Sequence, residues 1–177
     1  VRVGGLDTLA ATRKHLAQIM VEDCLRTRIK RQASSPKLVF SSNGQGISLA
    51  GTDSRFAAAM SEADIIHADG MSVVYASRLF TKTPLPERIA TTDFFHDAAE
   101  AAIEAGLSFF MLGGKEEQNA AACAAIMRLY PDLKIVGRRH GYFSQNEDED
   151  ICKEIVESGA DVLWVALGKP NQEFWSV

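Results

Sequence analysis

The stretch Ile65-Ile66-His67-Ala68-Asp69-Gly70 decides the predicted fold, because a short apolar run ends there in an acid and a glycine. Residues 71–79 then resume an apolar pattern at helical spacing, which predicts a strand, a tight turn and a helix. In a parallel α/β sheet, ligands bind at the carboxyl ends of the strands. Asp69 is therefore the first candidate for chemistry, and two interpretations are open: it lines a binding crevice, or it caps the following helix.

Strands and helices alternate on both sides of this segment. Further strands are predicted at 37–41, 107–112, 133–136 and 161–167, and helices at about 8–31, 47–63, 91–103, 115–130 and 146–158, with a last helix opening at 168–170. Elements of these lengths form right-handed β-α-β units. The sequence predicts an α/β class with a Rossmann-like, mostly parallel sheet flanked by helices. We expect one compact domain, residues 36–177, after a leading helical segment, residues 1–35.

The composition indicates a soluble globular domain, with 177 residues of which 46% are hydrophobic and 24% charged. The net charge of -4 and the pI near 5.6 argue against a nucleic-acid partner. Cys24, Cys123 and Cys152 lack metal spacing and indicate buried thiols in a reducing compartment. Because no apolar run reaches the ~20 residues that cross a bilayer, we expect a cytoplasmic protein or one attached to a membrane surface.

Both ends of the chain look cut. It begins at Val1 without methionine and stops at Val177, shortly after Phe174 and Trp175 begin to form a helix. We expect that part of the natural C-terminus is missing, and that apolar surface left uncovered there favours a homo-oligomer.

Three further loops carry candidate binding groups. Asn43-Gly44-Gln45-Gly46 follows a strand, next to the hydroxyls of Ser41 and Ser42, on the same edge as Asp69, although turn chemistry alone also explains its glycines. Arg88 precedes a helix N-terminus, where an arginine holds a phosphate or carboxylate or simply lies on the surface. The turn at Gly113-Gly114 offers backbone donors to a diphosphate.

Several common motifs are absent. The sequence contains no G-x-x-x-x-G-K-[ST] loop, no G-x-G-x-x-G turn and no G-x-S-x-G elbow, which weakens the NTPase, dinucleotide and hydrolase interpretations. The four histidines have no metal spacing, and His67, inside an apolar strand, is interpreted as a core residue. The acidic run 147–150 lies in the first turn of a predicted helix, where negative charge is favourable without a metal.

A series of short motifs occurs in a specific order from about Pro36 to the C-terminus: Asp69-Gly70-Met71, Arg88 with Thr92-Asp93, Leu112-Gly113-Gly114, Tyr130-Pro131 with Ile135-Val136-Gly137, Gly141-Tyr142-Phe143, and Gly168-Lys169-Pro170-Asn171-Gln172-Glu173. The series resembles the bacterial WecG/TagA/CpsF family of glycosyltransferases, which build surface polysaccharides and wall teichoic acids.

This resemblance implies an inverting, metal-independent transfer of a sugar of the N-acetylmannosamine type, or a related hexose, from a UDP-sugar to an acceptor on a polyprenyl diphosphate. The donor is a substrate, and no cofactor is expected. The place of action would be the inner face of the cell membrane, which family members contact through a basic, partly apolar C-terminal segment that this chain lacks. We therefore expect the 177-residue chain to fold but to turn over poorly. Comparable activity of the 177-residue chain and of a full-length version would contradict this.

The resemblance also implies roles for particular residues. Asp69 matches the general base that takes the proton of the acceptor hydroxyl. Substrate-binding positions match Ser41, which replaces a common threonine, and Asn43, Arg88, Gln172 and Glu173. Nucleotide-binding positions match Gly113, Gly114, Gly168 and Tyr142, the last as an aromatic ring that stacks on the base. Asn171 stands where the family often has lysine, so no lysine role is carried over.

Two other functions are compatible with an α/β fold. A non-catalytic nucleotide or nucleotide-sugar binding domain would have the same α/β layout, and the role of Asp69 distinguishes it from a transferase. A Rossmann oxidoreductase would need a G-x-G-x-x-G turn and an acid after the second strand, and neither is present.

Overall fold

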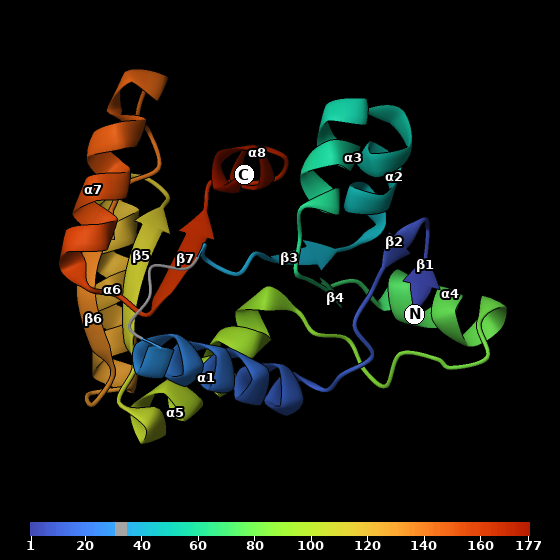
Figure 1. Ribbon diagram of the computed structural model, residues 1–177, viewed down its shortest axis with the longest axis horizontal. Helices are drawn as coiled ribbons and strands as arrows, with labels where there is room; N and C mark the ends of the chain where they lie inside the picture. Colours follow the sequence, from blue (N-terminus) through green and yellow to red (C-terminus); the bar gives the residue numbers. More distant parts are fainter. Residues whose placement is uncertain (31–34) are drawn as a thin grey trace. The chain divides into compact units, whose positions relative to one another are not determined.

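The computed structural model describes residues 1–30 and 35–177, which form two compact units (Figure 1). Among the described residues, unit 1 comprises 1–19, 35–97 and 169–177, and unit 2 comprises 20–30 and 98–168. Helices α1 (Arg13–Lys30) and α5 (Thr91–Ala105) contribute residues to both units. The predicted end of the leading helix, at residue 31, lies outside the described residues.

Unit 1 contains a short hairpin and a parallel pair of strands. The hairpin pairs β1 (Arg2–Val3) with β2 (Leu6–Asp7), and the parallel pair joins β3 (Val39–Ser42) to β4 (Ile65–Ala68). The sequence did not predict the hairpin, and it placed the start of the leading helix near residue 8. Instead, the Leu9 N–H donates to the Ile66 carbonyl over 2.7 Å, which holds this segment against β4 before α1 begins.

The helices of unit 1 follow the strands as predicted, with one difference. The structure contains α2 (Gly44–Thr52), α3 (Ser54–Ser61), α4 (Met71–Phe80) and α8 (Asn171–Ser176). One helix was predicted over 47–63, but Asp53 divides it. Its carboxylate accepts hydrogen bonds from the backbone N–H groups of Arg55 and Phe56, so it caps α3 and ends α2.

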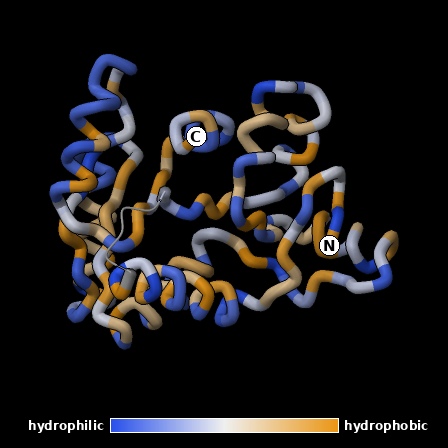
Figure 2. The backbone as a smooth tube through the Cα atoms, in the orientation of Figure 1, coloured by the Kyte–Doolittle hydropathy of each residue, from blue (hydrophilic) through white to orange (hydrophobic). Residues whose placement is uncertain are grey.

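Unit 2 contains a three-stranded parallel sheet in the order β6-β5-β7. Its strands are β5 (Ser108–Gly113), β6 (Lys134–Arg139) and β7 (Val162–Ala166), and its helices are α6 (Glu116–Leu129), α7 (Asp148–Ser158) and the short η1 (Gln145–Glu147). Figure 2 shows β5 and β7 mostly in hydrophobic colours.

Strand β6 continues through Gly137, where a loop was predicted. A Cβ at Gly137 would lie 2.4 Å from the Phe110 ring, so the glycine permits close contact between neighbouring strands and does not mark a turn.

Each unit has its own apolar core. In unit 1, Phe56 and Met60 of α3 pack with Phe40 and Ile66 of the strands. In unit 2, Phe109 and Phe110 of β5 are almost fully buried. Burial of a side chain of this size contributes ~1.5–3 kcal/mol to folding. The predicted α/β class with parallel strands flanked by helices is confirmed, and the strands form two separate parallel ladders.

The cysteines differ from the prediction of three buried thiols. Cys123 is buried, Cys24 is half-buried and Cys152 is exposed. Burial and the nearby Asp161 carboxylate raise the pKa of the Cys24 thiol to about 11, so this thiol is protonated at neutral pH. Within residues 1–30 and 35–177, no helix is long and apolar enough to cross a membrane.

Candidate active site

The loops that follow β3 and β4 lie side by side in unit 1, as predicted. Ser42 pairs with Ala68 in the parallel register, and the Asp69 N–H extends the ladder by donating to the Ser42 carbonyl over 2.8 Å. Gly70 lies close to Asn43, because a Cβ on Gly70 would be 3.3 Å from the Asn43 Cβ. The carboxyl ends of the two strands therefore bring Asn43 and Asp69 together.

The Asp69 side chain does not cap α4. The N-cap residue of this helix is Gly70, and the first turn has no side-chain cap. Asp69 is half-buried, and no described residue hydrogen-bonds to its carboxylate. The helix-cap interpretation is therefore wrong, and both oxygens remain available to a ligand.

Asn43 has a structural role that the sequence did not predict. Its Oδ1 accepts a hydrogen bond of 2.9 Å from the Gly46 N–H and so caps α2. No described residue accepts from its Nδ2, which leaves an amide donor at the same edge as Asp69. Asn43 can therefore cap its helix and also contact a sugar hydroxyl.

The segment Lys169 to Glu173 forms the third side of this edge. Lys169 Nζ donates to the Ser41 carbonyl over 3.0 Å and to Glu173 Oε1 over 2.5 Å. Glu173 is fully buried, and its Oε1 also accepts from Gln172 Nε2 over 3.3 Å. A buried ion pair thus fixes α8, which carries Gln172, against the end of β3, which carries Ser41.

Lys169 is a residue whose role the sequence reasoning did not assign. Its side chain is 8% exposed, and its ammonium lies 5.4 Å from the centre of the Phe56 ring. The only sequence signal was its position four residues before an acid, which is the spacing of an ion pair on one helix face, although α8 begins only at Asn171.

Arg88 lies beside the end of β4. The next residue, Ile89, donates its N–H to the Ala68 carbonyl over 2.6 Å. Arg88 is exposed, and its guanidinium donates to Asp93 in the first turn of α5 over 3.0 Å. Asp93 also contacts Arg13 at 3.7 Å. A ligand that engages Arg88 would therefore compete with an acid that has a second cationic partner.

His67 is a core residue, as predicted. It is 3% exposed, and its Nδ1 lies 2.9 Å from the Ile89 carbonyl. Burial lowers the pKa of the imidazole from 6.5, and the Asp69 carboxylate only partly opposes that shift. His67 is therefore neutral at pH 7, and its Nδ1–H donates a hydrogen bond to the Ile89 carbonyl oxygen.

The predicted nucleotide-binding residues all lie in unit 2. Gly113 has φ 134°, and a Cβ there would lie 2.2 Å from the Ala166 carbonyl oxygen. Gly141 packs against the same turn, with its N–H donating to the Gly114 carbonyl over 2.8 Å. Tyr142 follows it and is 70% exposed, so its ring is open to stacking. Gly168, with φ 77°, follows β7.

The donors of the Gly113-Gly114 turn are largely used within the protein. The Gly114 N–H points to the Ala166 carbonyl at 3.3 Å, and the Lys115 N–H donates to Gln118 Oε1. Glu116 and Glu117 occupy the first turn of α6. Because its glycines have no side chains, this turn allows a ligand to approach the backbone closely, but it offers few free N–H donors to a diphosphate.

Asn119 holds the strand ends of unit 2 and was missed from the sequence. Its Nδ2 lies 2.9–3.2 Å from three carbonyl oxygens, those of Met111, Gly113 and Arg139. The available signal was its spacing: Asn119 lies four residues before Cys123, on the same buried face of α6.

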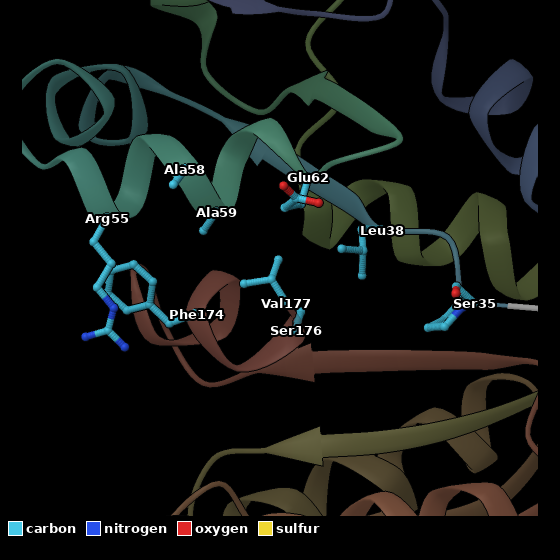
Figure 3. A pocket seen from close by; sticks show the side chains of 10 residues that line it. Ser35, Leu38, Arg55, Ala58, Ala59, Glu62, Phe174, Ser176 and Val177 are labelled. Atoms are coloured by element: carbon cyan, nitrogen blue, oxygen red, sulfur yellow. The ribbon is translucent and has the colours of Figure 1, made fainter.

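A cavity of about 650 Å³ in unit 1 lies away from these residues (Figure 3). Figure 3 shows Leu38 and Val177 facing this space from opposite sides, beneath α3. Leu38 precedes β3, so the cavity opens at the amino end of the strand, whereas Asp69 follows the carboxyl end of β4. None of the predicted site residues lines it.

Comparison with known proteins identifies relatives that cover most of the chain. An N-acetylglucosaminyldiphosphoundecaprenol N-acetyl-beta-D-mannosaminyltransferase of Bacillus spizizenii (strain W23) is 35% identical over 121 residues, 68% of this chain and 46% of the relative. A protein of the same name from Staphylococcus aureus (strain MRSA252) is 27% identical over 170 residues, 96% of this chain and 66% of the relative. The chain thus spans about half to two thirds of the length of these curated relatives.

A family model matches residues 9–176. That range includes Asp69 and every other residue that the motifs single out. The chain belongs to the glycosyl transferase WecG/TagA/CpsF family.

Proposed function

We propose that this protein is an inverting glycosyltransferase that moves an N-acetylmannosamine-type sugar from a UDP-sugar to a polyprenyl-diphosphate-linked acceptor. The observation that carries the proposal is the Asp69 carboxylate, which is half-buried at the end of β4 and has no hydrogen bond to a described residue. Family membership and the names of the two relatives support the choice of substrates.

Asp69 acts as the general base in this mechanism. The acceptor hydroxyl oxygen forms a bond to the anomeric carbon of the donor sugar, on the face opposite UDP. The bond from that carbon to the UDP β-phosphate oxygen breaks, and its electron pair leaves with UDP. Asp69 takes the hydroxyl proton, which requires only hydrogen-bond reach of the acceptor.

The neighbouring side chains bind and orient the sugars. Asn43 offers its Nδ2, and Gln172 is held in place through the buried pair of Lys169 and Glu173. Arg88 supplies a cation beside the end of β4. The first turn of α4, which has no side-chain cap, begins two residues after Asp69 and offers backbone N–H groups to negative charge.

We assign the nucleotide to the turn at Gly113-Gly114, to Gly168 and to the exposed ring of Tyr142, which suits stacking on a base. The sequence has no D-x-D pattern at a strand end, so we expect transfer to continue in the presence of EDTA. The acceptor is attached to a lipid in the relatives' names, so we place the reaction at the inner face of the cell membrane.

The decisive experiment measures UDP release from a panel of UDP-sugars, with a short lipid-diphosphate acceptor, for a version of the protein as long as its curated relatives and for Asp69→Asn in that version. We expect Asp69→Asn to slow transfer by about 10²–10⁴-fold. UDP binding should be unchanged, and the free energy of unfolding should change by less than ~0.5 kcal/mol. Release of no UDP from any donor, with UDP still bound, would support the non-catalytic binding domain instead.

Asp64→Asn is the matched control, because Asp64 precedes β4 at its other end. Its carboxylate accepts a hydrogen bond of 2.8 Å from the Leu38 N–H. We expect this substitution to lower stability by ~1 kcal/mol and to leave the transfer rate of the folded protein unchanged. Equal rate losses in the two variants would argue against a base role for Asp69.

A further inference from the structure

Helix α4 presents an apolar stripe to solvent. Met71, Tyr75 and Leu79 are spaced four residues apart and lie on one face, with exposed fractions of 38%, 55% and 77%. Phe80, at the helix end, is 83% exposed. The opposite face is fully used, because Val73 and Val74 pack in the core of unit 1. The stripe residues are not among the buried core residues of the unit.

The sequence segment that carries the stripe is basic. From Gly70 to Pro86 the sequence contains Arg78 and Lys82 and no acidic residue, in a chain whose net charge is -4. The Arg78 guanidinium lies 5.8 Å from the centre of the Tyr75 ring, which places a cation beside an aromatic ring on the exposed surface. Aromatic and aliphatic side chains next to arginine and lysine are typical of helices that lie at a lipid–water interface.

We propose that the exposed face of α4, formed by Met71, Tyr75, Leu79 and Phe80 with Arg78 and Lys82, docks on an anionic lipid surface. The apolar side chains enter the headgroup region, while the two cations contact lipid phosphates. A second copy of the chain fits this face less well, because the segment from Gly70 to Pro86 offers no acidic residue to pair with Arg78 and Lys82 of the other copy in a symmetric contact.

The position of the face suggests a role for lipid docking in the transfer reaction. This role rests on the proposed function. Helix α4 begins two residues after Asp69, so the stripe starts beside the general base. A lipid surface along α4 would present the diphosphate of a lipid-linked acceptor near the carboxyl end of β4. The helix would then bring the site to its substrate.

The test measures co-sedimentation of the 177-residue chain with vesicles of phosphatidylcholine alone or mixed with phosphatidylglycerol. We expect binding to the anionic vesicles that weakens at high salt. Leu79→Glu combined with Phe80→Glu should reduce partitioning at least ~10-fold. Arg78→Gln combined with Lys82→Gln should remove the preference for anionic vesicles.

Val156→Glu is the matched control, because Val156 is 78% exposed on α7. It should bind vesicles as the unaltered chain does, and circular dichroism should show all variants folded. Absence of vesicle binding by the unaltered chain, or equal loss in the control, would overturn the proposal. So would a change of oligomeric state in the Leu79 and Phe80 variant with unchanged vesicle binding, since α4 would then be a protein interface.

Vesicle binding requires no donor sugar, so its result is separate from that of the UDP-release experiment. If vesicles bind through α4 and no UDP-sugar is turned over, the transferase proposal fails and the docking surface remains. If transfer occurs on a short soluble acceptor and the α4 variants bind vesicles as the unaltered chain does, the docking proposal fails and the transferase proposal stands.

Discussion

Two fully buried serines of unit 1, Ser42 and Ser77, are in opposite hydrogen-bonding situations. Ser77 Oγ donates to the Val74 carbonyl over 2.7 Å and accepts from the Leu85 N–H over 2.9 Å. Ser42 Oγ has no partner among the described residues. Removal of a hydrogen-bonded buried group leaves its partners buried without a hydrogen bond, which costs stability. Removal of a group that has no partner carries no such cost.

We therefore expect Ser77→Ala to lower the free energy of unfolding by ~1–3 kcal/mol and Ser42→Ala to leave it unchanged or raise it slightly. Urea denaturation of the two variants measures the difference. A loss at Ser42 as large as that at Ser77 would mean that the Ser42 hydroxyl has a partner in solution.

His67 predicts a pH dependence of stability. Burial lowers the pKa of the folded imidazole below the 6.5 of the unfolded chain, so between these two values only the unfolded state binds the proton. The stability that neutral, buried His67 contributes is complete above pH 6.5. It is lost as the pH falls toward the folded pKa, and the free energy of unfolding then changes by at most ~1.4 kcal/mol per pH unit.

Denaturation at pH 7.5 and 5.5 tests this for the protein and for His67→Gln. The variant is expected to be less stable at pH 7.5, because its amide does not reproduce the imidazole contact with Ile89. Its stability should fall less between the two pH values. Parallel losses in both proteins would assign the pH dependence to other groups.

At the scale of single residues, motif order located Asp69 and Asn43, and the structure decided what their side chains do. The sequence left Asp69 as either a cap or a base, because an acid before a helix fits both. The backbone places Gly70 at the cap position, which excludes the first role. Asn43 was expected to contact sugar, and its capping of α2 became evident only from the Gly46 contact.

The helix α8 is held by an ion pair that is almost fully buried. The side chains of Lys169 and Glu173 are 8% and 0% exposed, and Glu173 Oε2 has no described partner. A buried charge that loses its partner is costly, whereas removal of both charges is much less so.

We expect Lys169→Met to lower stability by ~3–5 kcal/mol, and Lys169→Met combined with Glu173→Leu to recover much of that loss. Thermal denaturation measures both. If α8 positions Gln172, the double variant should regain fold but not the full rate of UDP release. Additive losses in the two single variants would show that the two residues do not act as a pair.

At the scale of elements, the sequence predicted order and type well and boundaries less well. β4 was predicted over its observed range, because its apolar residues are bounded by Asp64 and Asp69. The helix predicted over 47–63 is two helices, since helical spacing continues through Asp53 while its side chain caps α3. Gly137 was placed in a loop because glycine is common in turns, and only the Phe110 ring explains it within β6.

On the largest scale, each unit is stabilised by contacts between segments distant in sequence. In unit 2, Asp161 accepts hydrogen bonds from Arg28 of α1 at 2.6–2.7 Å and from Ser108 of β5 at 2.8 Å. Burial acts to raise the pKa of Asp161, but the hydrogen bonds from Arg28 and Ser108 outweigh it and lower the pKa below 3.8.

Because the folded pKa is lowered, the contribution of Asp161 is present above the unfolded pKa and is lost as the pH falls through the folded pKa. We expect Asp161→Asn to lower stability by ~1–2 kcal/mol at pH 7, a value reduced by solvent around Arg28. Stability should also fall less steeply below about pH 4 than in the unaltered protein.

Asp132→Asn is the matched control, because Asp132 is an exposed aspartate in a turn of the same unit. It should leave both the stability and its acid dependence unchanged. Equal effects at Asp132 and Asp161 would show that net charge, not the network, sets the acid sensitivity.

The sequence by itself determined the α/β class, the parallel pairing, the edge at which Asn43 and Asp69 meet and the family. These follow from local patterns: apolar periodicity, glycine and acid at strand ends, and the order of short motifs. Only the tertiary structure decided that Asp69 does not cap α4, that Lys169 joins Ser41 to Glu173, and that one face of α4 is left exposed. Those features depend on which distant atoms meet, and apart from the four-residue spacing of Lys169 and Glu173 the local patterns do not specify such contacts.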